Sequence, residues 1–151
     1  MNSEQIQIVR ETFALIAPRA ELAAMLFYKR LFELDPSLRP MFRGNMEEQA
    51  KKLMQMLGAA VRLLDRPETL LPVLEDLGRR HVSYAVRDEH YEPVGAALLS
   101  MLKETLGTSF TPAALEAWTT LYGLVAETMK RAAKKSRPAN FQGSGATPAH
   151  L

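Results

Sequence analysis

Apolar residues recur every three or four positions along almost the whole chain, which is the spacing of one face of an α-helix. The first run of this kind occupies Ile6, Val9, Phe13 and Ile16. No segment alternates apolar and polar residues in the way that a half-buried strand requires. The pattern predicts an all-α fold of about six to eight helices of unequal length, packed around one core.

Prolines, glycines and capping residues divide this helical pattern into segments. Ser3 is the expected N-cap of the first helix, Pro18 ends that helix, and Gly107 ends the fifth. The helices are predicted at about 3–17, 19–34, 47–64, 68–81, 91–106 and 112–133, with a short helical segment from Asp35-Pro36 to Met41-Phe42. Residues 82–90 are predicted to form an irregular, polar connection.

The chain of 151 residues is long enough for one domain with a core of its own. We predict that residues 1–133 form this domain and that residues 134–151 form a basic, disordered tail rich in Pro, Gly, Ser and Ala. The basic residues include a cluster between positions 130 and 137, whereas no acidic residue follows Glu127. The domain itself is therefore slightly acidic, which is not the charge distribution of a nucleic-acid-binding protein.

Composition excludes several further classes of protein. Because the chain has no cysteine, it cannot contain disulfides, cysteine-bound zinc, iron–sulfur clusters or thiol nucleophiles. The N-terminus resembles no signal peptide, and no apolar stretch approaches the ~20 residues that cross a bilayer, so we expect a cytoplasmic protein without membrane contact. A nucleophile elbow and a glycine-rich phosphate loop are also missing, so no residue is predicted to be catalytic.

Among the three histidines, His81 continues an apolar helix face four residues after Leu77. His90 and His150 lie in polar segments and are expected to be solvated. One inward histidine cannot complete an all-protein transition-metal site, but a porphyrin supplies four nitrogens and needs one axial histidine. The spacing is also compatible with a buried histidine bound to a backbone carbonyl, which is the commoner situation.

Three other side chains are candidates for a pocket, each with an ordinary structural alternative. Tyr28 lies on an apolar helix face, where its hydroxyl either enters a pocket or bonds to the backbone. Gln49 shares a face with Leu53 and Leu57, and it either enters a pocket or borders the core toward solvent. Phe42 is expected to be buried, which core packing explains without a ligand.

Taken together, the order of several segments resembles the globin family over about residues 3–133. The segments are similar to those of neuroglobins and of the globin domain of flavohemoglobins. They are Leu26-Phe27-Tyr28, Leu38-Arg39-Pro40-Met41-Phe42, Leu77-Gly78-Arg79-Arg80-His81, residues 94–99, Phe110-Thr111-Pro112, Ala117-Trp118 and Leu121-Tyr122-Gly123. The resemblance implies a globin fold around one heme b (iron protoporphyrin IX).

The resemblance also implies a role for each candidate residue. His81 matches the proximal histidine that binds iron, and the Leu77 carbonyl is expected to accept its other ring N–H. Tyr28 and Gln49 match the distal pair of bacterial globins. The remaining cofactor contacts expected are Phe42, Leu53, Leu57, Leu77, Tyr91 and Val94. Three basic residues either meet the heme propionates or are solvated: Lys52, Arg79 and Arg80.

Two departures from these relatives affect the chemistry that we expect. Neuroglobins have an iron-binding histidine where Gln49 stands, and glutamine is a poor iron ligand. We therefore expect five-coordinate ferrous iron with its sixth position open to a gas. Flavohemoglobins pair the proximal histidine with a tyrosine and a glutamate, whereas here Tyr91 matches the tyrosine but Ala133 stands at the glutamate position. His81 is then expected to be less imidazolate-like, which weakens peroxidase and dioxygenase chemistry.

These features predict reversible, high-affinity binding of O₂, with CO and NO as further ligands. The alternative is an enzyme, a nitric oxide dioxygenase that needs a separate reductase. A gas sensor or interaction module is the third possibility. The sequence leaves the physiological gas, the redox partner and the oligomeric state open.

Overall fold

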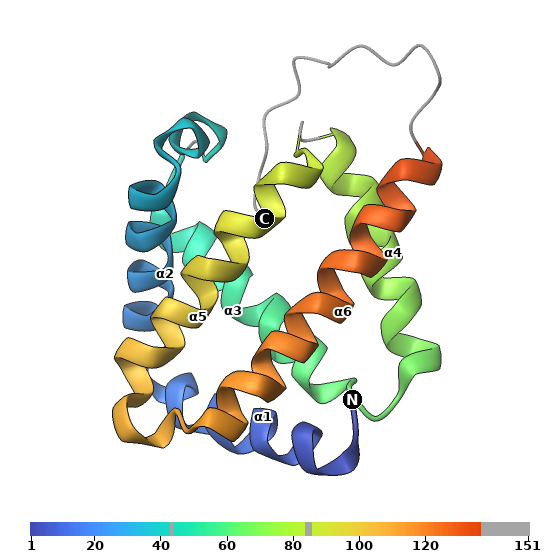
Figure 1. Ribbon diagram of the computed structural model, residues 1–151. Coiled ribbons are helices and arrows are strands. Elements are labelled where there is room, and N and C mark those ends of the chain that lie inside the picture. The colour runs from blue at the N-terminus through green and yellow to red at the C-terminus, as the bar shows by residue number, and fades with distance from the viewer. Residues whose placement is uncertain (43, 84–85, 137–151) are drawn as a thin grey trace.

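The computed structural model describes residues 1–42, 44–83 and 86–136, and these residues form helices and their connections without any strand (Figure 1). The α-helices are α1 (Ser3–Ile16), α2 (Ala20–Leu34), α3 (Met46–Arg62), α4 (Pro67–Ser83), α5 (Tyr91–Leu106) and α6 (Pro112–Ser136). The short 3₁₀ segments are η1 (Ala17–Arg19), η2 (Pro36–Met41), η3 (Asp88–His90) and η4 (Gly107–Ser109). The predicted all-α class is confirmed.

The helix boundaries follow the predicted ones closely, with three differences. Asn2 rather than Ser3 caps α1, because Asn2 Oδ1 accepts the Gln5 amide N–H at 2.8 Å and the Gln5 side chain accepts the Asn2 amide N–H at 3.1 Å. The connection predicted at 82–90 is partly helical, since α4 continues to Ser83 and η3 precedes α5. Helix α6 continues past the predicted end at Ala133, and the rest of the predicted tail, 137–151, lies outside the described residues.

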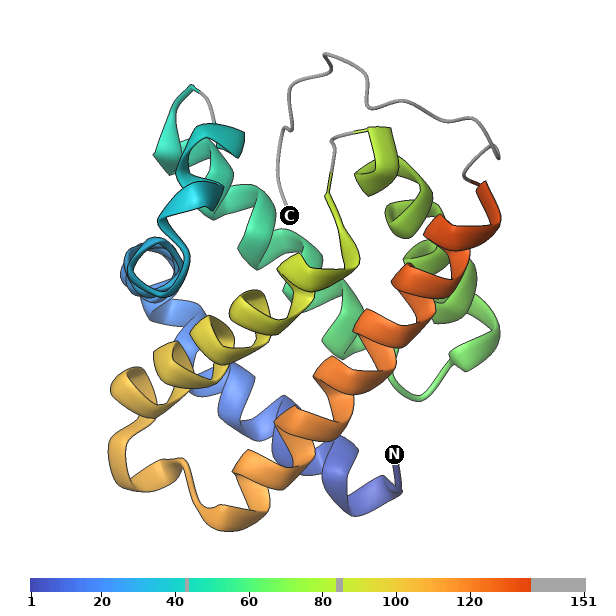
Figure 2. The ribbon, with the colours of Figure 1, turned by 45° about the horizontal axis from the view of Figure 1, so that its top comes forward.

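Two helix pairs account for much of the packing: α4 lies beside α6, and α2 lies beside α5 (Figures 1 and 2). Gly78 allows the first pair to approach closely, because a Cβ atom at this position would lie 2.3 Å from the Met129 carbonyl oxygen. His81 follows Gly78 by less than one helical turn. The close contact therefore fixes the part of α4 that carries His81.

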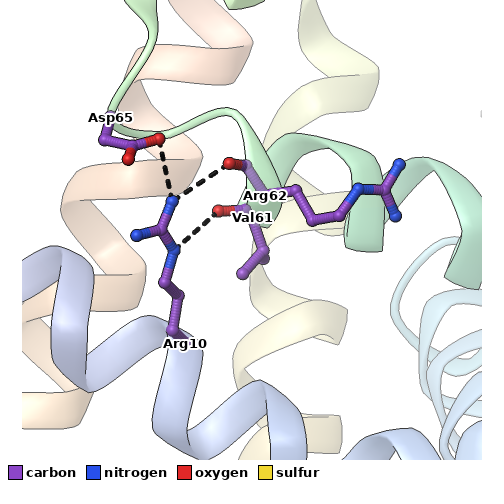
Figure 3. A network of polar contacts seen from close by, with 4 residues as sticks. All are labelled: Arg10, Val61, Arg62 and Asp65. Atoms are coloured by element: carbon purple, nitrogen blue, oxygen red, sulfur yellow. Dashed lines mark hydrogen bonds and ion pairs between the residues drawn. The ribbon is translucent and has the colours of Figure 1, made fainter.

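Helix α1 is joined to the end of α3 by the side chain of Arg10 (Figure 3). Arg10 Nε donates to the Val61 carbonyl oxygen at 3.3 Å, and Nη2 donates to the Arg62 carbonyl oxygen and to Asp65 Oδ1 at 3.0 Å each. Carbonyl groups in the last turn of a helix lack a full set of intrahelical partners. Arg10 supplies these partners and a positive charge at the C-terminus of α3, which favours that helix end.

Candidate functional site

A cavity lies between α3, α4, α5 and α6, with an empty volume of about 890 Å³ that includes its opening to solvent. The described residues on its wall are apolar or aromatic except for two histidines, His81 and His90. Pockets that hold cofactors and small organic ligands are likewise lined mainly by apolar and aromatic side chains with a few polar groups. The cavity is therefore suited to a large, mostly apolar organic group with a few polar contacts.

His81 lies on the wall of this cavity and is 2% exposed. Its Nδ1 atom is 2.7 Å from the Leu77 carbonyl oxygen, as expected from the sequence. Because a carbonyl oxygen can only accept, Nδ1 carries the proton, and Nε2 is the nitrogen whose lone pair can bind a metal. An ordinary buried histidine would make the same carbonyl bond, so the position on the cavity wall is what distinguishes His81.

The residues on the cavity wall could bind a metal only if a cofactor supplied most of the metal's other ligands. Among the described residues no cluster of three or more His, Cys, Asp or Glu side chains could hold a metal ion. An iron porphyrin meets this condition, since its four ring nitrogens leave one position for a histidine. The residues present therefore fit a porphyrin better than a bare metal ion.

Tyr28 and Gln49 are both buried and adjoin each other. Tyr28 is 2% exposed, and its hydroxyl donates to the Gln49 main-chain oxygen at 3.3 Å. Burial raises the pKa of the Tyr28 phenol, which therefore stays protonated. Gln49 is buried rather than bordering the solvent, and its side-chain Oε1 has no hydrogen-bond partner among the described residues. A buried amide oxygen without a partner is costly, so it is a candidate ligand contact.

Phe42 belongs to an aromatic cluster that also contains Tyr28. The Phe42 ring lies 5.3 Å from the Tyr28 ring and 5.6 Å from the Phe32 ring, in edge-to-face arrangements. Phe27 contacts Tyr28 at 5.0 Å and also lies on the cavity wall, so it links the cluster to the cavity.

The structure brings part of the predicted site together on one wall. The predicted residues that line the cavity are Leu53, Leu57, Leu77, His81, Tyr91 and Val94. Phe42, Tyr28 and Gln49 lie outside this wall, because Phe42 packs in the aromatic cluster and the Tyr28 hydroxyl is directed to the main chain of Gln49.

The prediction that His90 is solvated holds only in part. His90 is half-buried and lies on the cavity wall, because the 3₁₀ turn η3 folds directly into α5. Its Nδ1 atom accepts the Arg87 amide N–H at 3.0 Å. Burial is the largest influence on this imidazole and lowers its pKa. A sequence signal was present, since His90 precedes Val94 by four residues, the spacing of one helix face.

Helix α6 contributes a further part of the wall that the sequence analysis did not identify. Leu121, Val125 and Met129 line the cavity and recur every four residues along α6. Tyr122 also lines it, and its ring fits against Gly95, where a Cβ atom would lie 2.6 Å from the ring. The periodicity was visible in the sequence, but nothing local shows that this face borders a cavity rather than the solid core.

The basic residues considered for the propionates do not line the cavity. Arg80 Nε lies 3.1 Å from Asp76 Oδ2 and Arg79 Nη2 lies 3.9 Å from Asp76 Oδ1, on the exposed side of α4. Lys52 is exposed on α3. The structure therefore favours the alternative in which these three basic side chains are solvated.

The chain is similar to known proteins over most of its length. A sequence model of the globin family matches residues 25–129. Flavohemoproteins of Rhodopirellula baltica and Chromobacterium violaceum are 32% and 35% identical to it over 130 and 133 residues. These matches cover 84% and 85% of this chain but only 32% and 33% of those proteins, so the chain spans about a third of their length.

Solved structures give a consistent result. A bacterial globin from Campylobacter jejuni is 32% identical, with a TM-score of 0.77, over 89% of this chain and 97% of that chain. An engineered carbene transferase made from a candidate nitric oxide dioxygenase of Rhodothermus marinus is 26% identical, with a TM-score of 0.80, over 89% of this chain and 94% of that chain. Across the described residues, we find no helix with the length and hydropathy of a membrane span.

Proposed function

Because the chain belongs to the globin family, we propose that its cavity binds an iron porphyrin, heme b, with His81 as the axial ligand. One observation carries this proposal: the buried His81 imidazole lies on an apolar cavity wall with its Nδ1–H donated to the Leu77 carbonyl oxygen. This bond holds the ring in the tautomer that leaves Nε2 able to bind iron, and it orients the ring.

The iron supplies reversible binding of the diatomic gases O₂, CO and NO, which protein side chains do not provide. The chain holds the cofactor between apolar surfaces and keeps water away from it. Leu53 and Leu57 of α3 and Val94 of α5 are proposed as walls of this binding site, and all three line the cavity. Exclusion of water strengthens every hydrogen bond that is made inside such a pocket.

The side-chain amide nitrogen of Gln49 and the hydroxyl of Tyr28 are proposed as the donors of hydrogen bonds to the gas. The Tyr28 hydroxyl makes a long bond of 3.3 Å to the Gln49 main-chain oxygen, so little free energy is lost when it turns away. A hydrogen bond to a charged acceptor contributes about 1.5–3 kcal/mol, which would slow gas release about tenfold or more. Two donors favour high affinity and slow release, and thus storage or scavenging of O₂ rather than delivery.

The visible absorption spectrum of the hemin-reconstituted protein tests this proposal. We expect a Soret band, a five-coordinate spectrum after reduction with dithionite, and a spectral change on addition of O₂ or CO. His81→Gly should weaken hemin binding, and added imidazole should restore the spectrum because it replaces the missing ligand. Failure of the protein to bind hemin would overturn the proposal, whereas a six-coordinate reduced spectrum would contradict the open sixth position.

Nitric oxide dioxygenase activity is the second candidate function. The relatives named flavohemoproteins support it, as does the Rhodothermus marinus relative. The reaction combines one NO, one O₂ and one electron into one nitrate, so it needs an electron donor such as a separate reductase. His81 donates to a neutral carbonyl and Ala133 stands at the position of the glutamate, which favours gas binding over this enzyme.

Nitrate measurements distinguish the two candidates. The reduced, oxygenated protein is mixed with NO while a flavin reductase and nicotinamide cofactor supply electrons. Sustained nitrate production over many turnovers would support the enzyme, whereas one nitrate per protein would support the gas-binding function.

A further inference from the structure

We propose that His90 recognises the acidic edge of the porphyrin by donating a hydrogen bond from Nε2 to a carboxylate. This inference rests on the proposed function, because heme b carries propionate groups that an apolar cavity would not satisfy. It assigns a ligand contact to a histidine at the junction of η3 and α5, apart from the iron-binding residue.

The hydrogen bonding of His90 leaves Nε2 as the donor atom of its ring. Its Nδ1 accepts the Arg87 amide N–H at 3.0 Å, so the neutral ring carries its proton on Nε2. Within the part of the chain that the structure describes, Nε2 makes no hydrogen bond. The ring is on the cavity wall but only half-buried, which places it where the cavity meets solvent and where a carboxylate is least costly. Burial lowers the pKa of His90, so the neutral donor is the form present at neutral pH.

Several other donors near the cavity already have acceptors. His81 Nδ1 is bound to the Leu77 carbonyl oxygen, and the Tyr122 hydroxyl donates to the Tyr91 carbonyl oxygen at 2.5 Å. The arginines of α4 pair with Asp76 away from the cavity wall. His90 is therefore more available than any of these side chains to donate a hydrogen bond to a carboxylate of a ligand in this cavity.

Two acids act electrostatically on His90, namely Glu89 and Asp35, and each makes polar contacts of its own. Glu89 Oε1 lies 3.3 Å from Nη1 of Arg87. Asp35 Oδ1 accepts the Ser37 amide N–H at 3.1 Å and the Ser37 hydroxyl.

Two variants and two probes test this contact. In His90→Asn, the amide oxygen can still accept the Arg87 N–H, but the side chain is too short to replace Nε2. In His90→Gln, the amide nitrogen reaches the position of Nε2 and remains a donor. The probes are hemin and hemin dimethyl ester, in which the propionates are uncharged, and the measurement is the rate of transfer of each probe to excess apomyoglobin.

We expect hemin to leave His90→Asn about tenfold faster than wild type, because a charge-assisted hydrogen bond is lost. The ester should leave both proteins at similar rates, and His90→Gln should restore much of the hemin retention. Equal acceleration of both probes by His90→Asn would indicate a merely structural role, and no acceleration of either would exclude the contact. If the wild type bound neither probe, the proposed function itself would fail, which is a separate result.

Discussion

The buried Tyr28 and the partly buried Tyr122 each donate the hydroxyl to a main-chain oxygen, but over different distances. Tyr122 bonds to the Tyr91 carbonyl oxygen at 2.5 Å, and Tyr28 bonds to the Gln49 carbonyl oxygen at 3.3 Å. Burial raises the pKa of both phenols, so both remain donors at neutral pH. The longer bond leaves the Tyr28 hydroxyl available for a ligand, whereas the shorter bond of the Tyr122 hydroxyl is a structural contact within the fold.

This difference predicts that only one of the two Tyr→Phe substitutions changes the rate of O₂ release. Tyr28→Phe should speed O₂ dissociation about tenfold or more, because a hydrogen bond to the gas is lost, while stability changes by less than about 1 kcal/mol. Tyr122→Phe is the matched control and should leave the O₂ dissociation rate nearly unchanged. Stopped-flow measurement of O₂ release checks both, and an unchanged rate in Tyr28→Phe would remove Tyr28 from the mechanism.

At the scale of helices, glycine allows two helices to pack more closely than any residue with a Cβ atom would permit. A Cβ atom at Gly78 would collide with the Met129 backbone of α6, whereas a Cβ atom at Gly123, also in α6, would meet nothing within 4 Å. The first glycine is therefore required by packing and the second is not.

Alanine substitutions at these two glycines should change stability in opposite directions. Gly78→Ala is expected to destabilise the protein by about 1–3 kcal/mol or more, since backbone rather than a flexible side chain must move. Gly123→Ala should stabilise it by up to about 1 kcal/mol through helix propensity. Urea denaturation measures both, and equal effects would mean that the close contact of α4 with α6 is not essential.

The contact between α1 and the end of α3 predicts a dependence of stability on pH. The hydrogen bond from Arg10 is the main cause that lowers the pKa of Asp65 below its ordinary value. A folded-state pKa below the unfolded value of about 3.9 means that the stabilisation is present above about pH 4. It is lost as the pH falls through the folded-state pKa.

Asp65→Asn should therefore be less stable than wild type at pH 7 and should lose this difference at lower pH. Both side chains are exposed, so added salt should also reduce the difference. Urea midpoints of the two proteins at pH 7 and below pH 4 give the comparison. A difference that stays constant across this range would contradict the assignment to Asp65.

At the scale of the whole molecule, the cavity is assembled from α3, α4, α5 and α6, with Phe27 from α2. An apolar cavity of this kind lowers the stability of the empty protein, because its lining lacks partner atoms. A ligand that fills the cavity and binds only the folded state must raise the free energy of unfolding.

Hemin should accordingly stabilise the protein against heat. At a free concentration 100 times the Kd, binding adds about 2.7 kcal/mol, which corresponds to a rise in Tm of about 10 °C for a domain of this size. His81→Gly should lose most of this rise relative to its own apoprotein, which is expected to unfold at a lower temperature than wild type because glycine weakens α4. Differential scanning calorimetry with and without hemin measures the effect, and an identical rise in both proteins would argue against His81 as the ligand.

The sequence by itself determined the all-α class, the helix boundaries to within a few residues, and the place of His81 on an apolar face with Leu77. Helical periodicity and capping depend on residues within a few positions of one another, so a single chain carries that information. The tertiary structure decided that α6 forms a cavity wall, that the partly exposed His90 lies on this wall, and that Gln49 is buried. These outcomes depend on how helices distant in sequence pack, and the local pattern of an apolar face is the same whether it borders a cavity or a filled core.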